Sequence, residues 1–119
     1  MSYPTKVSEI ISEKDHPSIG INDQGHITFV NEIFTREYGW EKDELLNQPI
    51  TAIIPHHLRE AHQIGFSRFL TTETPRLLGK PLPLEVLLKD GRVKSAEHFI
   101  LAEKEDGVWR IAALLKTVS

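Results

Sequence analysis

The feature that most constrains the fold is a pair of Asp-Gly turns in the C-terminal half of the chain. Asp90-Gly91 and Asp106-Gly107 each lie between two stretches rich in apolar residues. Asp-Gly between extended segments is the strongest short-range signal of a β-hairpin, because both residues tolerate the positive φ angles of a tight turn. We therefore expect three consecutive antiparallel strands, at residues 82–88, 93–103 and 108–118.

A similar turn lies near the start of the chain. The segment 23–25, Asp-Gln-Gly, separates two short β-rich runs and predicts an antiparallel pair of strands at 18–22 and 26–30. Before them, apolar residues at helical spacing predict a short amphipathic helix in a leader segment, residues 1–14. The domain proper then spans residues 15–119, and we expect the leader to dock on it or on a partner.

The middle of the chain has helical patterns. Asn31 stands where an N-cap residue belongs, and Gly39 ends the helix that follows. A short helical turn is expected at 41–47, and residues 56–72 form the longest helical pattern. Strands first, helices in the middle and strands last indicate an α+β domain, in which short helices cover one face of a single five-stranded antiparallel sheet.

Composition excludes several classes of function. The 119 residues suffice for one domain, and a net charge of −3 without any run of Lys or Arg argues against a nucleic-acid-binding surface. The absence of cysteine excludes disulfides, thiolate ligands and Cys nucleophiles. The longest apolar stretch, 111–115, is too short to cross a membrane, so we expect a cytoplasmic protein. The sequence has no residues at nucleophile-elbow spacing and no paired carboxylates on a shared apolar face, so no catalytic pattern indicates an enzyme.

Three histidines lie on the predicted long helix, at His56, His57 and His62. A helix turns by about 100° per residue, so these side chains point in different directions and do not form a chelating trio. His62 stands apart because it lies on an apolar stripe. The other residues of that stripe are Leu58, Gly65, Phe66 and Phe69.

A single imidazole on an apolar stripe has two interpretations. In the first, His62 is a core histidine bonded to a backbone carbonyl, since buried polar groups need partners. In the second, it is the axial ligand of a haem, which requires one imidazole, an apolar slot and cations for the propionates. Arg68 and Arg76 are the candidate cations. The helical pattern alone leaves both interpretations open.

A second histidine lies on the strand predicted at 93–103. Side chains alternate between the faces of a strand, so Ala96, His98 and Ile100 share one face while Phe99 and Leu101 share the other. If the face with Ala96 turns toward the helices, His98 enters the same interior as His62; otherwise it is an exposed or edge residue. The strand at 108–118 is apolar on both faces, which favours a central position.

The order of these motifs resembles a PAS domain of the sensory-box type. The matching residues are Asp23, Gly25, Ile27 and Asn31, then Tyr38-Gly39-Trp40, then Glu44-Leu45-Leu46, and the resemblance runs from about residue 17 to 119. It implies an internal ligand cavity and homodimers that pair through the leader and the outer sheet face. It also implies signalling to an effector such as a histidine kinase or a cyclase, as in bacterial two-component systems.

A narrower resemblance is to the haem-binding PAS domains of oxygen-sensing histidine kinases. It starts at Pro55, Arg59 and His62, and continues through 69–79 and 89–91. On this match His62 takes the position of the axial iron ligand, and Arg68 one that contacts a propionate. We expect the following residues around the cofactor: His62, Phe66, Arg68, Phe69, Arg76, Leu77, Leu82, His98, Ile100 and Ala113.

The sequence also departs from that family. The distal arginine that holds oxygen in such sensors is replaced by Leu82, which cannot donate a hydrogen bond. His98 falls at an aliphatic distal position, so with haem present it either donates to a bound diatomic molecule or ligates the iron directly. Without haem, the chain is a sensor of a small organic metabolite or an apo dimerisation module. The motif with which domains of this family end is replaced here by residues 117–119. We therefore expect either an excised module or a standalone protein that acts through a partner.

Overall fold

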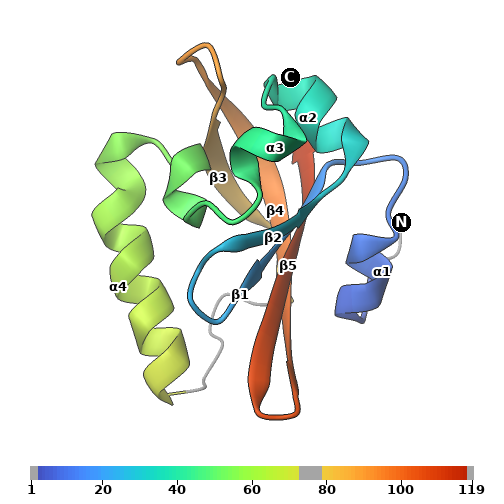
Figure 1. Cartoon of the computed structure of the whole chain (residues 1–119), viewed down its shortest axis with the longest axis vertical. Helices are drawn as coiled ribbons and strands as arrows, with labels where there is room; N and C mark the ends of the chain where they lie inside the picture. The colour runs from blue at the N-terminus through green and yellow to red at the C-terminus, as the bar shows by residue number, and fades with distance from the viewer. Residues whose placement is uncertain (1–2, 73–78, 118–119) are drawn as a thin grey trace.

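The elements follow the expected order of strands, helices and strands (Figure 1). The computed structural model describes residues 3–72 and 79–117. Within these ranges the elements are α1 (Val7–Ile11), β1 (Ser18–Asn22), β2 (Ile27–Val30), α2 (Glu32–Tyr38), α3 (Lys42–Leu45), the 3₁₀ helix η1 (Ile50–Ile53), α4 (His56–Thr72), β3 (Leu82–Leu87), β4 (Val93–Glu105) and β5 (Val108–Thr117). The α+β class is confirmed.

The five strands form one antiparallel sheet in the order β2-β1-β5-β4-β3. β5 lies in the centre, as its apolar residues on both faces predicted. β3 is an edge strand and carries Pro83, whose missing N–H group suits an edge. β4 is longer than predicted because Asp106 and Gly107 both have positive φ angles, 52° and 80°, which lets pairing continue up to the turn.

The two faces of the sheet carry separate apolar cores. The helix-side core consists of Ile19, Ile27, Val30, Phe34, Tyr38, Leu45, Ile53, Val86, Leu88, Ala96 and Leu115. The outer core consists of Val7, Ile10, Phe99, Ala112 and Leu114. Neighbouring residues of β5, Leu114 and Leu115, therefore point into different cores. The prediction that the middle helices cover one face is confirmed for α2 and α3, and the leader helix α1 lies on the opposite face.

The leader docks on the domain itself. Val7 and Ile10 of α1 are buried against the outer core. The backbone N–H of Val7 donates to Glu103 Oε2 at 2.9 Å, and the Tyr3 hydroxyl donates to Glu97 Oε1 at 2.8 Å. Two carboxylates on the outer face of β4 thus hold the leader in place.

Asn31 ties the leader, β1 and α2 together. Its Oδ1 accepts the N–H of Phe34 at 2.9 Å, which is the expected N-cap, and also the N–H of Ser18 at 3.1 Å. Its Nδ2 donates to the carbonyl oxygens of His16 at 2.8 Å and Glu13 at 3.3 Å. One amide therefore satisfies four backbone groups from three segments.

Replacing this amide tests its role. We expect Asn31→Ala to lower the free energy of unfolding by about 2–3 kcal/mol, because the N-cap bond is lost together with bonds to partly buried backbone groups. Gln48→Ala, at an exposed loop residue, is the control and should change it by less than about 0.5 kcal/mol. Urea denaturation measures both, and equal losses in the two variants would contradict this assignment.

Candidate functional site

The long helix α4 is attached to the rest of the domain through a few side chains. Figure 1 shows α4 beside the tip of the β1–β2 hairpin. The ring of Phe66 packs on Gly25 in that tip. The rings of Phe69 and Trp109 are arranged edge to face, with their centroids 4.8 Å apart. Near its N-terminus, Arg59 Nε donates to the carbonyl of residue 54 at 2.9 Å. Neither α4 nor another helix in the described ranges is long and apolar enough to cross a membrane.

His62 projects from the half-buried side of α4. Its Nδ1 is enclosed, and its ring makes no hydrogen bond within residues 3–72 and 79–117. The ring lies nearly parallel to that of Phe66, with centroids 6.0 Å apart and planes 18° apart. Burial lowers the pKa of His62, so the imidazole is neutral near pH 7. The interpretation of His62 as a carbonyl-bonded core histidine therefore has no support among the described residues.

The other two histidines of α4 point elsewhere, as predicted. His56 and His57 are exposed, and Nε2 of His57 lies 3.1 Å from Glu85 Oε1. Among the residues that the structure describes, no three His, Asp or Glu side chains are grouped so as to hold a metal ion.

His98 is buried on the helix side of β4, with 9% of its surface exposed. It shares this face with Ala96 of the helix-side core, which is the inward one of the two orientations that the sequence left open. Its Nδ1 lies 3.0 Å from the carbonyl oxygen of Ala96, and because a carbonyl only accepts, Nδ1 carries the proton. Burial lowers the pKa of His98, although the bond to Ala96 opposes this shift. The ring is therefore neutral, with a lone pair on Nε2.

The remaining predicted site residues divide into three groups. Leu82 of β3 pairs with His98, and Ile100 of β4 pairs with Ala113 of β5, so these half-buried side chains line the same face of the sheet. Phe66 and Phe69 lie on the half-buried side of α4, whereas Arg68, predicted to contact a propionate, is exposed. The predicted residues Arg76 and Leu77 lie outside the described residues.

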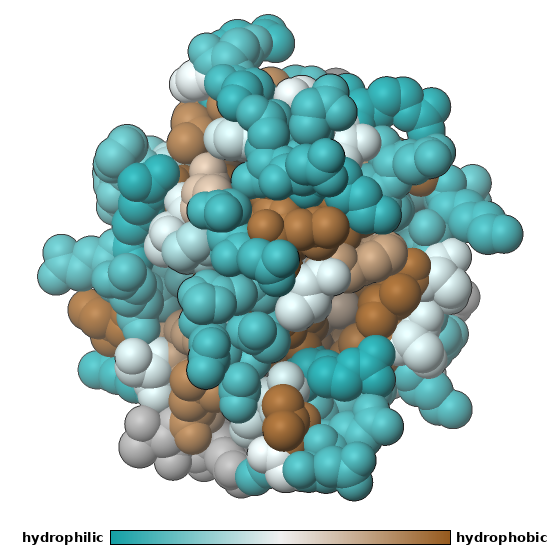
Figure 2. All heavy atoms as spheres, in the orientation of Figure 1, coloured by the Kyte–Doolittle hydropathy of each residue, from teal (hydrophilic) through white to brown (hydrophobic). Residues whose placement is uncertain are grey.

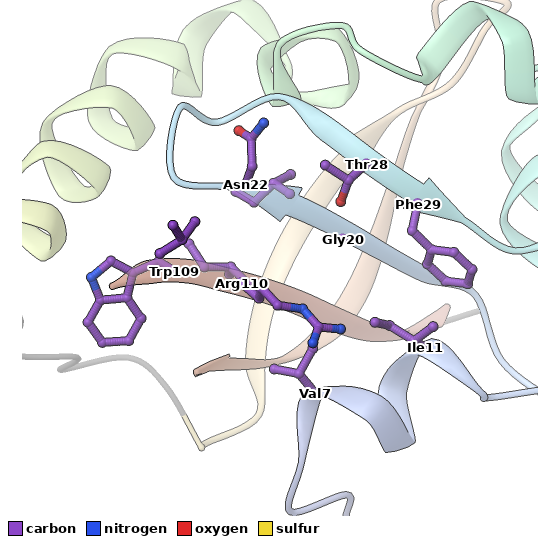
Figure 3. Close-up of a pocket in the computed structure, with 11 residues that line it drawn as sticks. Val7, Ile11, Gly20, Asn22, Thr28, Phe29, Trp109 and Arg110 are labelled. Atoms are coloured by element: carbon purple, nitrogen blue, oxygen red, sulfur yellow. The ribbon is translucent and has the colours of Figure 1, made fainter. Parts of the chain in front are cut away.

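Sequence reasoning missed a hollow of about 350 Å³ on the outer face of the sheet. Gly20 and Phe29 line it together with Val7 and Ile11 of α1, and Figure 3 shows Arg110 extending from β5 toward Val7. Its position depends on where α1 docks, which no local pattern specifies. Neither this hollow nor a second one beside α2, near Arg36 and Glu37, is lined by His62 or His98.

The buried imidazoles predict a pH dependence of stability. Both have a pKa below the ordinary value of 6.5 in the folded state, so below that pH the unfolded chain binds more protons than the folded protein. Their contribution to stability is complete above about pH 6.5 and is lost as the pH falls toward the folded-state pKa values. We expect the Tm to fall between about pH 7.5 and about pH 5.5.

His62→Gln should reduce that fall, because the variant lacks one of the two groups. His57→Gln, which removes an exposed histidine of the same helix, should leave it nearly unchanged. Thermal unfolding followed by circular dichroism at several pH values measures the effect. The same pH dependence in the wild type and His62→Gln would contradict the burial of this imidazole.

Comparison with known proteins identifies the fold. No protein-family model matches the chain, and no curated protein matches its sequence. Solved structures do match in shape. The PAS domain of an HTR-like protein from Haloarcula marismortui has a TM-score of 0.71 at 19% identity, covering 94% of this chain and 88% of its own. A PAS domain from Colwellia psychrerythraea has a TM-score of 0.73 at 14% identity, covering 93% and 92%.

A PAS domain from a two-component sensor histidine kinase has a TM-score of 0.67 at 13% identity, covering 92% of this chain and 91% of its own. All three similarities extend over almost the whole length of both chains. The order, pairing and position of the strands are therefore those of a known architecture, and the chain has the PAS fold.

Proposed function

We propose that the chain is a signal-sensing PAS module that binds a ligand between α4 and the sheet, with haem as the favoured cofactor. The observation that carries this proposal is the enclosed, unpartnered Nδ1 of His62. A buried polar atom without a partner costs about 1–3 kcal/mol, so such an atom suggests a site kept for a group that is not part of the protein. A neutral imidazole is also the form that binds iron.

The proposed cofactor site draws its residues from α4 and from the sheet. His62 would be the axial ligand. Apolar walls would come from α4 and from the helix side of the sheet, through Phe66, Phe69, Leu82, Ile100 and Ala113. Haem would supply an iron atom that binds a diatomic gas or changes its oxidation state.

Access to this site requires α4 to move, because neither hollow described above is lined by His62. The contacts that resist the movement include Phe66 on Gly25, Phe69 on Trp109 and His57 Nε2 near Glu85 Oε1. All of these contacts are made by side chains of α4, and within residues 3–72 and 79–117 no backbone pairing joins α4 to a strand. Ligand binding would therefore be coupled to the position of this helix.

β4 provides a route from the site to the leader. His98 and Ile100 face the helix side, while Glu97 and Glu103 of the same strand hold the leader on the outer side. A displacement of β4 would change both sets of contacts, since a strand moves as one unit. The similarity to the PAS domain of a sensor histidine kinase supports an effector of that class. A homodimer remains part of this proposal.

The outer face also favours a second candidate, a docking module that needs no cofactor. Its hollow lies beside α1, and the exposed Val108 lies at its edge. Elsewhere apolar exposure is limited: Figure 2 shows small groups of apolar side chains surrounded by polar ones on the face with β2 in front. In this alternative a partner or a second copy would dock next to the leader.

Haem reconstitution tests the first candidate. Hemin added to the purified protein should give a Soret band that differs from that of free hemin, with one haem bound per chain. His62→Ala should weaken binding about tenfold or more, because the axial ligand is lost. His57→Ala is the matched control on the same helix and should bind like the wild type.

Circular dichroism must show that both variants are folded. A wild-type protein that fails to shift the hemin spectrum would exclude the haem site. Equal binding by the wild type and His62→Ala would exclude His62 as its ligand. In either case the docking candidate would take its place.

A further inference from the structure

We propose that the hollow on the outer face of the sheet binds a small carboxylic acid with an apolar tail. This hollow lies on the opposite face of the sheet from His62, so the inference goes beyond the proposed function and does not depend on haem. It also differs from the docking candidate, in which a protein surface covers the same place. A glycine, a β-bulge and one cation in the lining support a small-molecule site.

The glycine is Gly20, which lines the hollow in the middle of β1 (Figure 3). Its strand partners are Phe29 of β2 and Ala112 of β5. Its φ angle is negative, and an added Cβ would meet its nearest neighbour at 3.5 Å, an ordinary contact distance. The backbone therefore does not require glycine here. Glycine inside a strand lowers stability relative to alanine, and it often marks a place where a ligand approaches the backbone closely.

The β-bulge lies in β2, opposite Gly20. Gly20 pairs with Phe29, but Ile21 pairs with Ile27, so Thr28 is an extra residue in β2. Thr28 Oγ1 and Phe29 Cβ both lie 3.6 Å from the position that a Cβ would take at Gly20. Successive residues of a regular strand point to opposite faces, so the bulge brings the Thr28 hydroxyl to the same side as the Phe29 ring. Bulges of this kind are common beside functional sites, where they redirect a side chain.

The lining indicates which kind of molecule fits. Val7 and Ile11 of α1 and the ring of Phe29 offer apolar surface, and a volume of about 350 Å³ lies at the lower end of the range for small-molecule pockets. Among the described residues that line the hollow, Arg110 carries the only charge. An apolar wall with one guanidinium matches an apolar molecule that ends in a carboxylate.

Arg110 has donors to offer to such a carboxylate. Its side chain extends from β5 toward Val7 (Figure 3). Within residues 3–72 and 79–117 its one hydrogen bond runs from Nη1 to Glu105 Oε2 at 2.9 Å. The two side chains are 47% and 65% exposed, so this ion pair contributes little and can rearrange. A guanidinium has five N–H donors, so it can bind a carboxylate through two of them and still keep Glu105.

Binding in the hollow would be coupled to the leader. A molecule there would lie between α1 and the sheet, in contact with Val7 and Ile11. A ligand that binds only when α1 is docked stabilises the docked state by mass action. Glu97 and Glu103 of β4 hold the same leader. The hollow would therefore sense a metabolite through the position of the leader, independently of His62.

Titration with octanoate tests the inference, and octanol is the matched probe without a carboxylate. Heteronuclear NMR of the isotope-labelled protein should show saturable octanoate-induced shifts at the amides of Gly20, Thr28 and Arg110, but none along α4. Octanol should bind about tenfold or more weakly, because it lacks the two charge-assisted hydrogen bonds to Arg110. Arg110→Gln should remove this difference between the probes. Glu105→Gln, which removes only the partner of Arg110, should preserve it.

Filling the hollow is the second test. Gly20→Val should weaken octanoate binding about tenfold or more without lowering the urea midpoint of unfolding, because valine favours a strand. If the valine variant folds poorly, Gly20→Ala, whose Cβ meets only ordinary contacts, should still weaken binding. Gly65→Ala, at an exposed glycine of α4 with open space around its Cβ position, is the control and should bind like the wild type.

The possible results separate this site from the others. No saturable shift in the wild type, shifts confined to α4, or undiminished binding in both Gly20 variants would overturn it. Shifts at the hollow that grow with protein concentration in the absence of octanoate would overturn it in favour of a second copy of the chain. Hemin reconstitution is an independent measurement, so a failure of the haem proposal would leave the outer site standing.

Discussion

The structure depends on one constraint, which is that the central strands β4 and β5 are apolar on both faces. Each strand sends alternate side chains into two different cores, so both faces of the sheet must be covered. The leader meets this need on the outer side, where Val7 is 1% exposed and Ile10 is 0% exposed. Burying one such side chain contributes about 1.5–3 kcal/mol. The leader is therefore an integral part of the domain.

On the helix side the cover is uneven. Phe34, Tyr38 and Leu45, from α2 and α3, are completely buried in the helix-side core. On the same face of the sheet, in contrast, Ile100 and Ala113 remain half-buried. Regions with fewer buried apolar contacts open at a lower free-energy cost than the rest of a domain. The face that carries the two candidate ligands is thus also the one where rearrangement is least costly.

The sequence predicted those parts of the fold that local patterns determine. The bounds of α4 follow from its helical pattern after Pro55, and the central place of β5 follows from its two apolar faces. The 3₁₀ helix at Ile50–Ile53 was not predicted, because four residues do not establish a period. The docking of α1 was left open, since it depends on which strand face remains uncovered once the sheet has formed.

The candidate site shows the same division. Alternation along β4 predicted that His98 shares a face with Ala96 but left open which core that face joins, and helical spacing separated His62 from His56 and His57. The bond from Nδ1 of His98 to Ala96 could not be predicted, because it depends on the rotamer that the packed side chain adopts.

The two buried imidazoles also bear on the choice between a ligand-binding module and an apo module. A leucine or methionine at residue 62 or 98 would fill a similar volume without a polar nitrogen to desolvate, and core replacements of that kind usually preserve a fold. An imidazole without a partner therefore lowers the stability of the apo protein. Metal binding would offset that loss, because the enclosed Nδ1 of His62, which has no partner among the described residues, could bind iron. The cost in the folded apo state thus favours the ligand-binding interpretation.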